Sequence, residues 1–166
     1  MADAFLIVVD DAKAQAWFGR LLERSHDLSG LMADIGETLT ESTQRRFALG
    51  IAPDGTPWVP LADGSGRTPL VDTGRMRNDI APSHGPDWVE ISAGARQARW
   101  HQEGTGPYTI EPKNKKALAW AGGPGPRKKV HHPGLPARPF IGLSAEDEQA
   151  IERLAEAWLD LAPGGG

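Results

Sequence analysis

Two prolines that flank a single arginine constrain the last third of this chain. Pro136 and Pro139 hold the backbone extended around Arg138, because proline fixes its own φ and disfavours a helical residue before it. Apolar side chains follow from Phe140, where the chain would dock onto a core, and a helix is expected to begin at Ser144. The run holds little catalytic chemistry. It indicates a rigid connection that presents one arginine, which favours a role in assembly.

The composition limits the classes of protein that the chain can belong to. A length of 166 residues predicts one domain, and 20 glycines with 14 prolines predict long irregular loops. The net charge of −4 argues against a protein whose main task is to grip nucleic acid. The lack of cysteine excludes disulfides and thiolate chemistry. We expect a single domain over residues 1–162 and a flexible tail over residues 163–166.

The apolar run near the N-terminus is short. It covers Ala4 to Val9 and lies between Asp3 and Asp10, without the basic residues that begin a signal sequence. It is also too short to span a membrane. We expect a soluble protein that is made in the cytoplasm and has no membrane partner.

Helical periodicity is clearest in two segments. In the first, apolar residues recur at intervals of three and four, namely Leu28, Leu31, Met32, Ile35 and Leu39. Asp27 is the expected N-cap of this helix, and Gly50 is its expected end. The second helix runs from Ser144 to Leu161, with an apolar face and an acidic one.

Short β-branched or alternating segments predict the strands. They are Phe5–Val9, Trp88–Ser92, Tyr108–Ile110 and Ala117–Trp120, and the last two are expected to form a hairpin with a basic tip. A third helix is expected over residues 10–22. Together these elements predict an α+β fold, in which a small, mainly antiparallel sheet packs against three longer helices and one short helix.

The triplet Asp72-Thr73-Gly74 allows two interpretations. It is like one half of an aspartic protease dyad, but that chemistry needs two aspartates that share a proton. The sequence holds no second such triplet. A helix cap is favoured, in which Asp72 or Thr73 starts the short helix and Met76 and Ile80 turn inward.

The histidines suggest a zinc site made of His101, His131 and His132. Adjacent histidines rarely bind one ion together, and the spacing of known zinc motifs is missing. His101 is therefore expected to be a structural hydrogen-bonding residue, with the other two on an exposed loop. A pairing of His101 with Glu103 as acid and base lacks a nucleophile. We expect no catalytic residue, no metal and no cofactor, and a metal-dependent hydrolase is the weakest alternative.

Five segments together form a specific signal, because they occur in a fixed order. They are Arg46-Phe47, Pro53-Asp54-Gly55 with Trp58 and Leu61, Leu70 with Asp72-Thr73-Gly74-Arg75, His101-Gln102-Glu103-Gly104, and Pro136-Ala137-Arg138-Pro139-Phe140 with Gly142 and Leu143. From about Phe5 to the final helix the chain resembles the phage virion morphogenesis family, the Mu-type and P2-type tail completion proteins. The stretch His132-Pro133-Gly134 is similar to the related neck proteins of siphophages. The chain departs from the family in a Gly/Pro insertion from Gly122 to Pro126.

The resemblance implies a structural role late in virion assembly, in a phage or a prophage. Such proteins complete the tail or join it to the head, usually as a sixfold ring around the DNA channel. The implied partners are other copies in a hexameric ring, other tail, neck or tail-terminator proteins, and DNA that passes without specific binding. The implied location is the virion, after assembly in the host cytoplasm. No catalytic residues are implied.

Charge is divided unevenly along the second half of the chain. Between Lys113 and Arg138 there are seven basic residues and no acids, whereas six acids and one arginine lie between Gly142 and Leu161. The basic part can meet an acidic surface of a neighbour, or both parts can simply be solvated. A nucleic-acid-binding accessory protein that uses residues 113–129 is the alternative. It ranks lower because DNA must slide through a tail channel, and each phosphate contact adds drag.

Cationic, aromatic and neighbouring polar side chains are the expected contacts with another subunit or partner. They are Arg75, Trp100, His101, Gln102, Lys113, Lys115, Lys116, Arg138 and Phe140. Arginine suits such contacts because its planar guanidinium makes bidentate bonds. The other tryptophans in apolar patterns are expected in the core, namely Trp58, Trp88, Trp120 and Trp158. Trp100 fits the core and an interface equally well.

Overall fold

Two small antiparallel sheets and helices of two lengths make up the described part of the fold. The computed structural model describes residues 5–6, 15, 19, 27–119, 123 and 125–161. Its elements are β1 (Phe5–Leu6), α2 (Ser29–Leu49), α3 (Arg75–Asn78), β2 (Ile80–His84), β3 (Val89–Ala93), α4 (Ala98–Glu103), β4 (Tyr108–Ile110), β5 (Val130–His132) and α5 (Ala145–Leu161). The predicted α+β class is confirmed, with two long and two short helices among these residues.

Some of the predicted elements lie outside the described residues. The predicted helix over residues 10–22 does so, apart from Gln15 and Gly19, which are helical. So do Trp120, most of the predicted strand after Leu6, and the predicted tail over residues 163–166.

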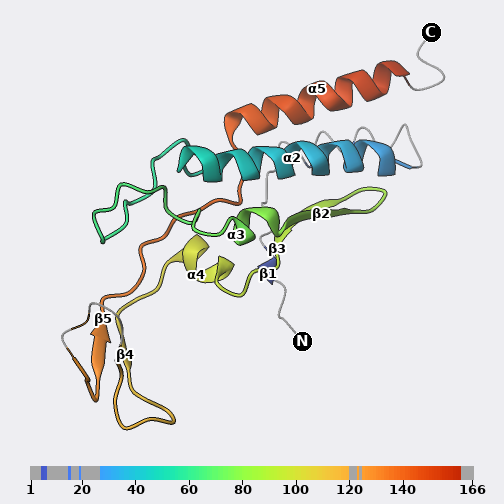
Figure 1. Ribbon diagram of the computed structural model, residues 1–166. Coiled ribbons are helices and arrows are strands. Elements are labelled where there is room, and N and C mark those ends of the chain that lie inside the picture. Colours follow the sequence, from blue (N-terminus) through green and yellow to red (C-terminus); the bar gives the residue numbers. More distant parts are fainter. Residues whose placement is uncertain are drawn as a thin grey trace.

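Helix α2 is the central element of the body. It packs against α5 on one side and against β2, β3 and α3 on the other (Figure 1). The sheet beneath it has the order β1-β3-β2, and Ile80 pairs with Ala93 while His84 pairs with Val89. Gly36 lets the helix lie close to this sheet, because a Cβ at Gly36 would lie 3.0 Å from the Cβ of Pro82.

The predicted apolar stripe of α2 is buried along its whole length, from Leu28 to Leu39. The helix ends as predicted at Gly50, which has a φ of 69° and donates its N–H to the Arg46 carbonyl at 2.7 Å. The prediction of Asp27 as N-cap is wrong, since Leu28 occupies that position and no side chain caps the helix. Asp27 instead accepts a hydrogen bond from the Ser29 N–H at 2.8 Å, a local turn that competes with capping.

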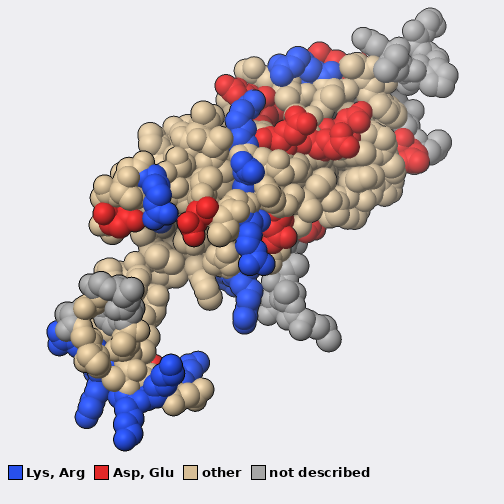
Figure 2. Space-filling model, viewed as in Figure 1, with Lys and Arg blue, Asp and Glu red and all other residues tan. Residues whose placement is uncertain are grey.

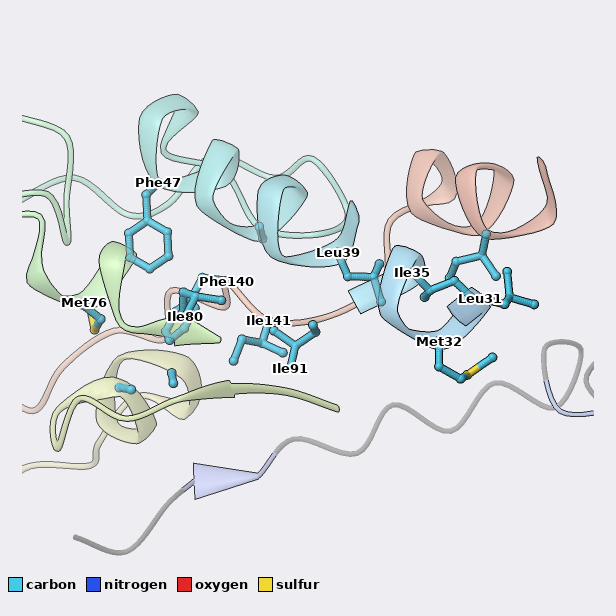
Figure 3. Close-up of a cluster of buried hydrophobic side chains, with 14 of the residues drawn as sticks. Leu31, Met32, Ile35, Leu39, Phe47, Met76, Ile80, Ile91, Phe140 and Ile141 are labelled. Atoms are coloured by element: carbon cyan, nitrogen blue, oxygen red, sulfur yellow. The ribbon is translucent and has the colours of Figure 1, made fainter. Parts of the chain in front are cut away.

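The core lies between α2, the sheet and the segment after Pro139 (Figure 3). Apolar side chains from all of these parts meet there, among them Leu31, Ile35, Phe47, Ile80, Ile91, Phe140 and Ile141. Phe47 is its aromatic centre, with ring centroids 5.6 Å from Trp58 and 5.1 Å from Phe140. Arrangements of this kind add stability beyond the area that they bury.

A two-stranded arm projects from the body (Figure 1), and we call residues 105–119 and 125–135 the β4–β5 arm. The predicted hairpin between residues 108–110 and 117–120 is wrong. Strand β4 pairs with β5, which comes after the Gly/Pro insertion from Gly122 to Pro126. Residues near Leu118 make only an isolated bridge to Arg127. The base of the arm is closed by mutual backbone hydrogen bonds between Thr105 and Leu135, at 2.9 and 3.2 Å.

Three local predictions need correction. The N-cap of α3 is Gly74, and neither Asp72 nor Thr73 makes a capping bond, although Thr73 Oγ1 accepts from the Arg75 N–H at 3.4 Å. Ile80 is buried as expected but lies in β2, because α3 is only one turn long. Trp88 is 48% exposed at the β2–β3 turn, so its prediction as a core residue is wrong.

The remaining core tryptophans follow the prediction where they are described. Trp58 is buried, and Trp158 packs partly buried against the core. Within the residues described, no helix combines the length and the apolar character that crossing a membrane requires.

Candidate functional site

The segment from Pro136 to Ser144, here called the proline strap, turns its arginine inward. The Arg138 guanidinium donates to the carbonyl oxygens of Val59 and Pro60, at 2.8 and 3.1 Å, and only 5% of the residue is exposed. Burial lowers the pKa of Arg138 from its ordinary value. Phe140 is fully buried. Both were predicted to contact a partner, and the structure uses both side chains inside the chain.

Helix α4 holds the strap from the other side. The Gln102 Oε1 accepts from the N–H groups of Phe140 and Ile141, at 2.9 and 3.1 Å. Its Nε2 donates to the Ile141 carbonyl at 2.9 Å. One amide thus satisfies three backbone groups of an extended segment that pairs with none of the described strands.

His101 contacts the strap through its backbone. Its carbonyl accepts from the Arg138 N–H at 2.6 Å. The prediction that its side chain is a structural hydrogen-bonding group is wrong for Nδ1, which is buried without a partner among the described residues. Burial and the charge of Arg138 both lower the pKa of this imidazole. A neutral His101 is the form that this position favours.

The junction between α2 and α5 is a buried ion pair that the sequence predictions missed. Arg46 pairs with Asp147, and Arg46 Nη1 also donates to the carbonyls of Phe140 and Gly142 at 2.9 and 2.8 Å. Asp147 accepts from the N–H and the hydroxyl of Ser144, at 2.8 and 2.7 Å. The sequence does indicate the role of Asp147 at the start of α5, because an acid three residues after a serine is typical of a capped helix start. Nothing local, however, names Arg46 as its partner.

The β4–β5 arm carries exposed cations at its far end. Figure 2 shows lysine and arginine side chains gathered there, and the exposed ones are Lys113, Lys115, Lys116, Arg127, Lys128 and Lys129.

The two histidines of β5 make contacts within the arm. His132 stacks on Tyr108 with ring centroids 4.8 Å apart and accepts from the Gly134 N–H, while His131 bonds Thr109 Oγ1. No group of three metal-ligating side chains occurs in the described ranges.

Acidic side chains gather on the body over α2 and α5 (Figure 2). On α5 the exposed residues Glu148, Glu152 and Glu156 follow one another at intervals of four. They come one residue after Asp147, Ile151 and Ala155, which are buried, so they form a row along one flank of the helix. We call these three residues the glutamate row.

A polar cleft lies beside α3, the short helix that packs on the side of α2 opposite α5. Its volume is about 590 Å³, and its lining includes Arg75, Asn78, Asp79, Arg96 and Gln97. Arg75 was a predicted contact residue and is exposed there. Trp100 is 54% exposed on α4, the helix that begins directly after Gln97, so its burial in the core is excluded. We call this feature the Arg75–Arg96 cleft.

The comparisons with known proteins agree with the resemblance seen in the sequence. The sequence model of the phage virion morphogenesis family matches residues 9–160. The chain belongs to the phage virion morphogenesis family. One relative, the tail completion protein S of Escherichia phage P2, is 31% identical over 131 residues, which cover 78% of this chain and 83% of that protein. No solved structure gives a significant match.

In this member of the virion morphogenesis family, the proline strap is the last of the five matching segments, and three of the other four contact it. Arg46 donates to strap carbonyls, and Trp58 Nε1 donates to the Pro139 carbonyl at 2.8 Å. Gln102 holds Phe140 and Ile141, and the side chain of Pro53 lies against Gly142. The residues of the family pattern therefore lie where the strap is attached to α2, to α4 and to the loop after α2.

Proposed function

We propose that this chain is a structural protein of a tailed bacteriophage or prophage, which completes the tail or joins the tail to the head. The likeness to tail completion protein S carries this proposal, because it covers most of both chains. The family match over residues 9–160 supports the same role.

The proposed action is geometric and needs no covalent chemistry. Copies of the chain form a ring, hexameric in this proposal, around the channel through which DNA passes. The ring docks onto other tail, neck or tail-terminator proteins, first in the host cytoplasm and then in the virion. The use of the polar side chains supports this, since Arg46, Gln102 and Arg138 bind the chain's own backbone. The exposed cations of the arm also provide a surface that an acidic neighbouring protein can contact.

The arm is proposed to contact protein through Lys113, Lys115 and Lys116, which are exposed near its far end. The alternative use, binding nucleic acid through residues 113–129, is less favoured because phosphate contacts would slow DNA in the channel.

Phage particles made without this chain test the proposed role. Electron microscopy should show heads and tails that are not joined, or tails with an unfinished end, and infectivity should be lost. Normal infectious particles without the chain would overturn the proposal.

A triple change of Lys113, Lys115 and Lys116 to Gln separates the two uses of the arm. We expect fewer complete particles, with no change in the affinity of the purified chain for duplex DNA. The matched control changes the same three residues to Arg, which keeps the charge, and should give near-normal particles. Loss of a strong, steeply salt-dependent DNA affinity in the Gln variant would instead support the nucleic-acid use.

A further inference from the structure

The Arg75–Arg96 cleft holds two cationic groups that the chain itself does not use. Neither guanidinium has a hydrogen bond or an ion pair with any residue that the structure describes, whereas Arg45, Arg67 and Arg99 each pair with an acid. An unpaired guanidinium in a concave, polar setting is arranged to bind a carboxylate in bidentate fashion.

The walls of the cleft are held in place by the core. Arg75 precedes Met76, which is buried, and Arg96 lies two residues before Ala98, which is fully buried. The Asn78 amide oxygen accepts from Arg77 Nε at 3.1 Å, so its N–H groups are left to donate into the cleft. The backbone that carries these groups is anchored, so it loses little conformational freedom on binding, unlike the loop that carries the lysines of the arm.

One acid in the cleft narrows the class of ligand. Asp79 lines it beside the two arginines, so the site has a small positive excess. A polyphosphate backbone carries closely spaced charges, so one of its phosphates would lie against this carboxylate. A few spaced carboxylates on a protein surface can instead pair with the arginines and avoid Asp79.

The glutamate row of α5 presents such carboxylates. Glu148, Glu152 and Glu156 are exposed, and none has an ion pair with a described residue. Like charges at intervals of four weaken a helix, so the row is a cost to the isolated chain that a cationic partner would relieve.

The two surfaces belong to elements on opposite sides of α2. Helix α5 packs on one side of α2, and α3, whose residues Arg75 and Asn78 line the cleft, packs on the other (Figure 1). Different patches on opposite sides produce a head-to-tail contact, which continues into a ring or a filament and does not stop at a dimer.

We propose that the Arg75–Arg96 cleft binds the glutamate row of α5 from a second copy of this chain. The inference rests on the proposed function only in that copies of the chain associate. It names the two surfaces that meet and the direction of the contact.

Sedimentation velocity on the full chain tests this contact. The wild-type mass should rise beyond a dimer with concentration and fall with added salt. The variants Arg75→Gln/Arg96→Gln and Glu148→Gln/Glu152→Gln/Glu156→Gln should each be monomeric. Mixed together, they should form a one-to-one complex and nothing larger, because each keeps one working surface. All these side chains are exposed, so circular dichroism should show folded variants.

The matched control is Arg127→Gln/Lys128→Gln on the arm, which changes the net charge as much as the cleft variant and should leave association intact. Three results would overturn the proposal: a wild-type chain still monomeric at about 1 mM, where even weak complexes form; a cleft variant that associates like wild type; or an arm control that is monomeric. A monomeric chain that phage particles still require would remove this contact and leave the proposed role standing.

Discussion

The guanidinium of Arg46 and the carboxylate of Asp147 form an ion pair closed off from solvent, with 4% and 3% of their side chains exposed. The pair joins the last turn of α2 to the first turn of α5. Because Arg46 also holds the carbonyls of Phe140 and Gly142, the same side chain fixes the end of the proline strap. Helix α5 is thus attached through a polar junction in addition to its apolar face.

Replacing Asp147 by Asn should destabilise the chain strongly. The change leaves the Arg46 charge buried and unpaired, and breaking a buried pair in this way costs about 3 to 5 kcal/mol. Urea unfolding measures the loss. The control is Arg45→Gln, which removes the exposed pair with Glu146 and should cost less than about 1 kcal/mol. Equal losses in the two variants would contradict the importance given to the buried pair.

The same carboxylate should make stability depend on pH. Burial alone raises the pKa of Asp147, but hydrogen bonds from Ser42 and Ser144 and the charge of Arg46 bring it below the ordinary value. The unfolded chain therefore binds the proton more readily, so acid favours unfolding. The stabilisation is complete above the unfolded pKa of about 3.9 and is lost as the pH falls through the lower folded value.

Urea midpoints measured over an acidic pH series test this dependence. The wild-type curve should fall more steeply than that of Asp147→Asn below about pH 5, because the variant lacks the titrating carboxylate. Parallel curves would show that other groups cause the acid dependence.

Gln102→Ala should loosen the strap. The variant loses the amide that satisfies three backbone groups of Phe140 and Ile141, so the free energy of unfolding should drop by about 1 to 3 kcal/mol. Gln97→Ala, at an exposed position just before α4, should change it by less than about 0.5 kcal/mol. A Gln102 variant as stable as the Gln97 control would show that water replaces the amide without loss.

Gly134→Ala should disturb the base of the β4–β5 arm. Gly134 has a φ of 95°, and a Cβ there would lie 2.1 Å from the Thr105 carbonyl oxygen. Backbone strain of this kind costs at least about 1 kcal/mol. Trypsin should then cut at the lysines of the arm faster than in wild type. Gly106→Ala is the control, because its Cβ would meet no atom within 4 Å and cleavage should stay at the wild-type rate.

Sequence patterns identify the elements that depend on near neighbours. The stripe from Leu28 to Leu39, the stop at Gly50 and the alternation before Ala93 all follow from the period of a single helix or strand. The α+β class follows from these elements, and the order of the five segments identifies the family.

The rest depends on contacts between distant parts of the chain. The carbonyls that accept hydrogen bonds from the Arg138 guanidinium belong to Val59 and Pro60, nearly eighty residues earlier in the sequence. The sequence pattern around Arg138 predicts an exposed contact, whereas the side chain is internal. Strand β4 does not pair with residues 117–120, which are nearer in the sequence, but with Val130–His132. The backbone hydrogen bonds between Thr105 and Leu135 set this pairing, because they bring the two ends of the arm together. The Arg75–Arg96 cleft likewise forms between α3 and the loop that follows β3, which no local period connects.

The length of the arm separates the basic residues at its tip from the acidic residues of the body. From Thr105 to Lys113 an extended chain spans at most about 26 Å, which is about three screening lengths at physiological salt. The lysines at its tip therefore do little to neutralise the glutamates of their own body. The cations of the arm and the acids of the body can therefore act on a neighbour as two independent surfaces, and each acts only within about one screening length.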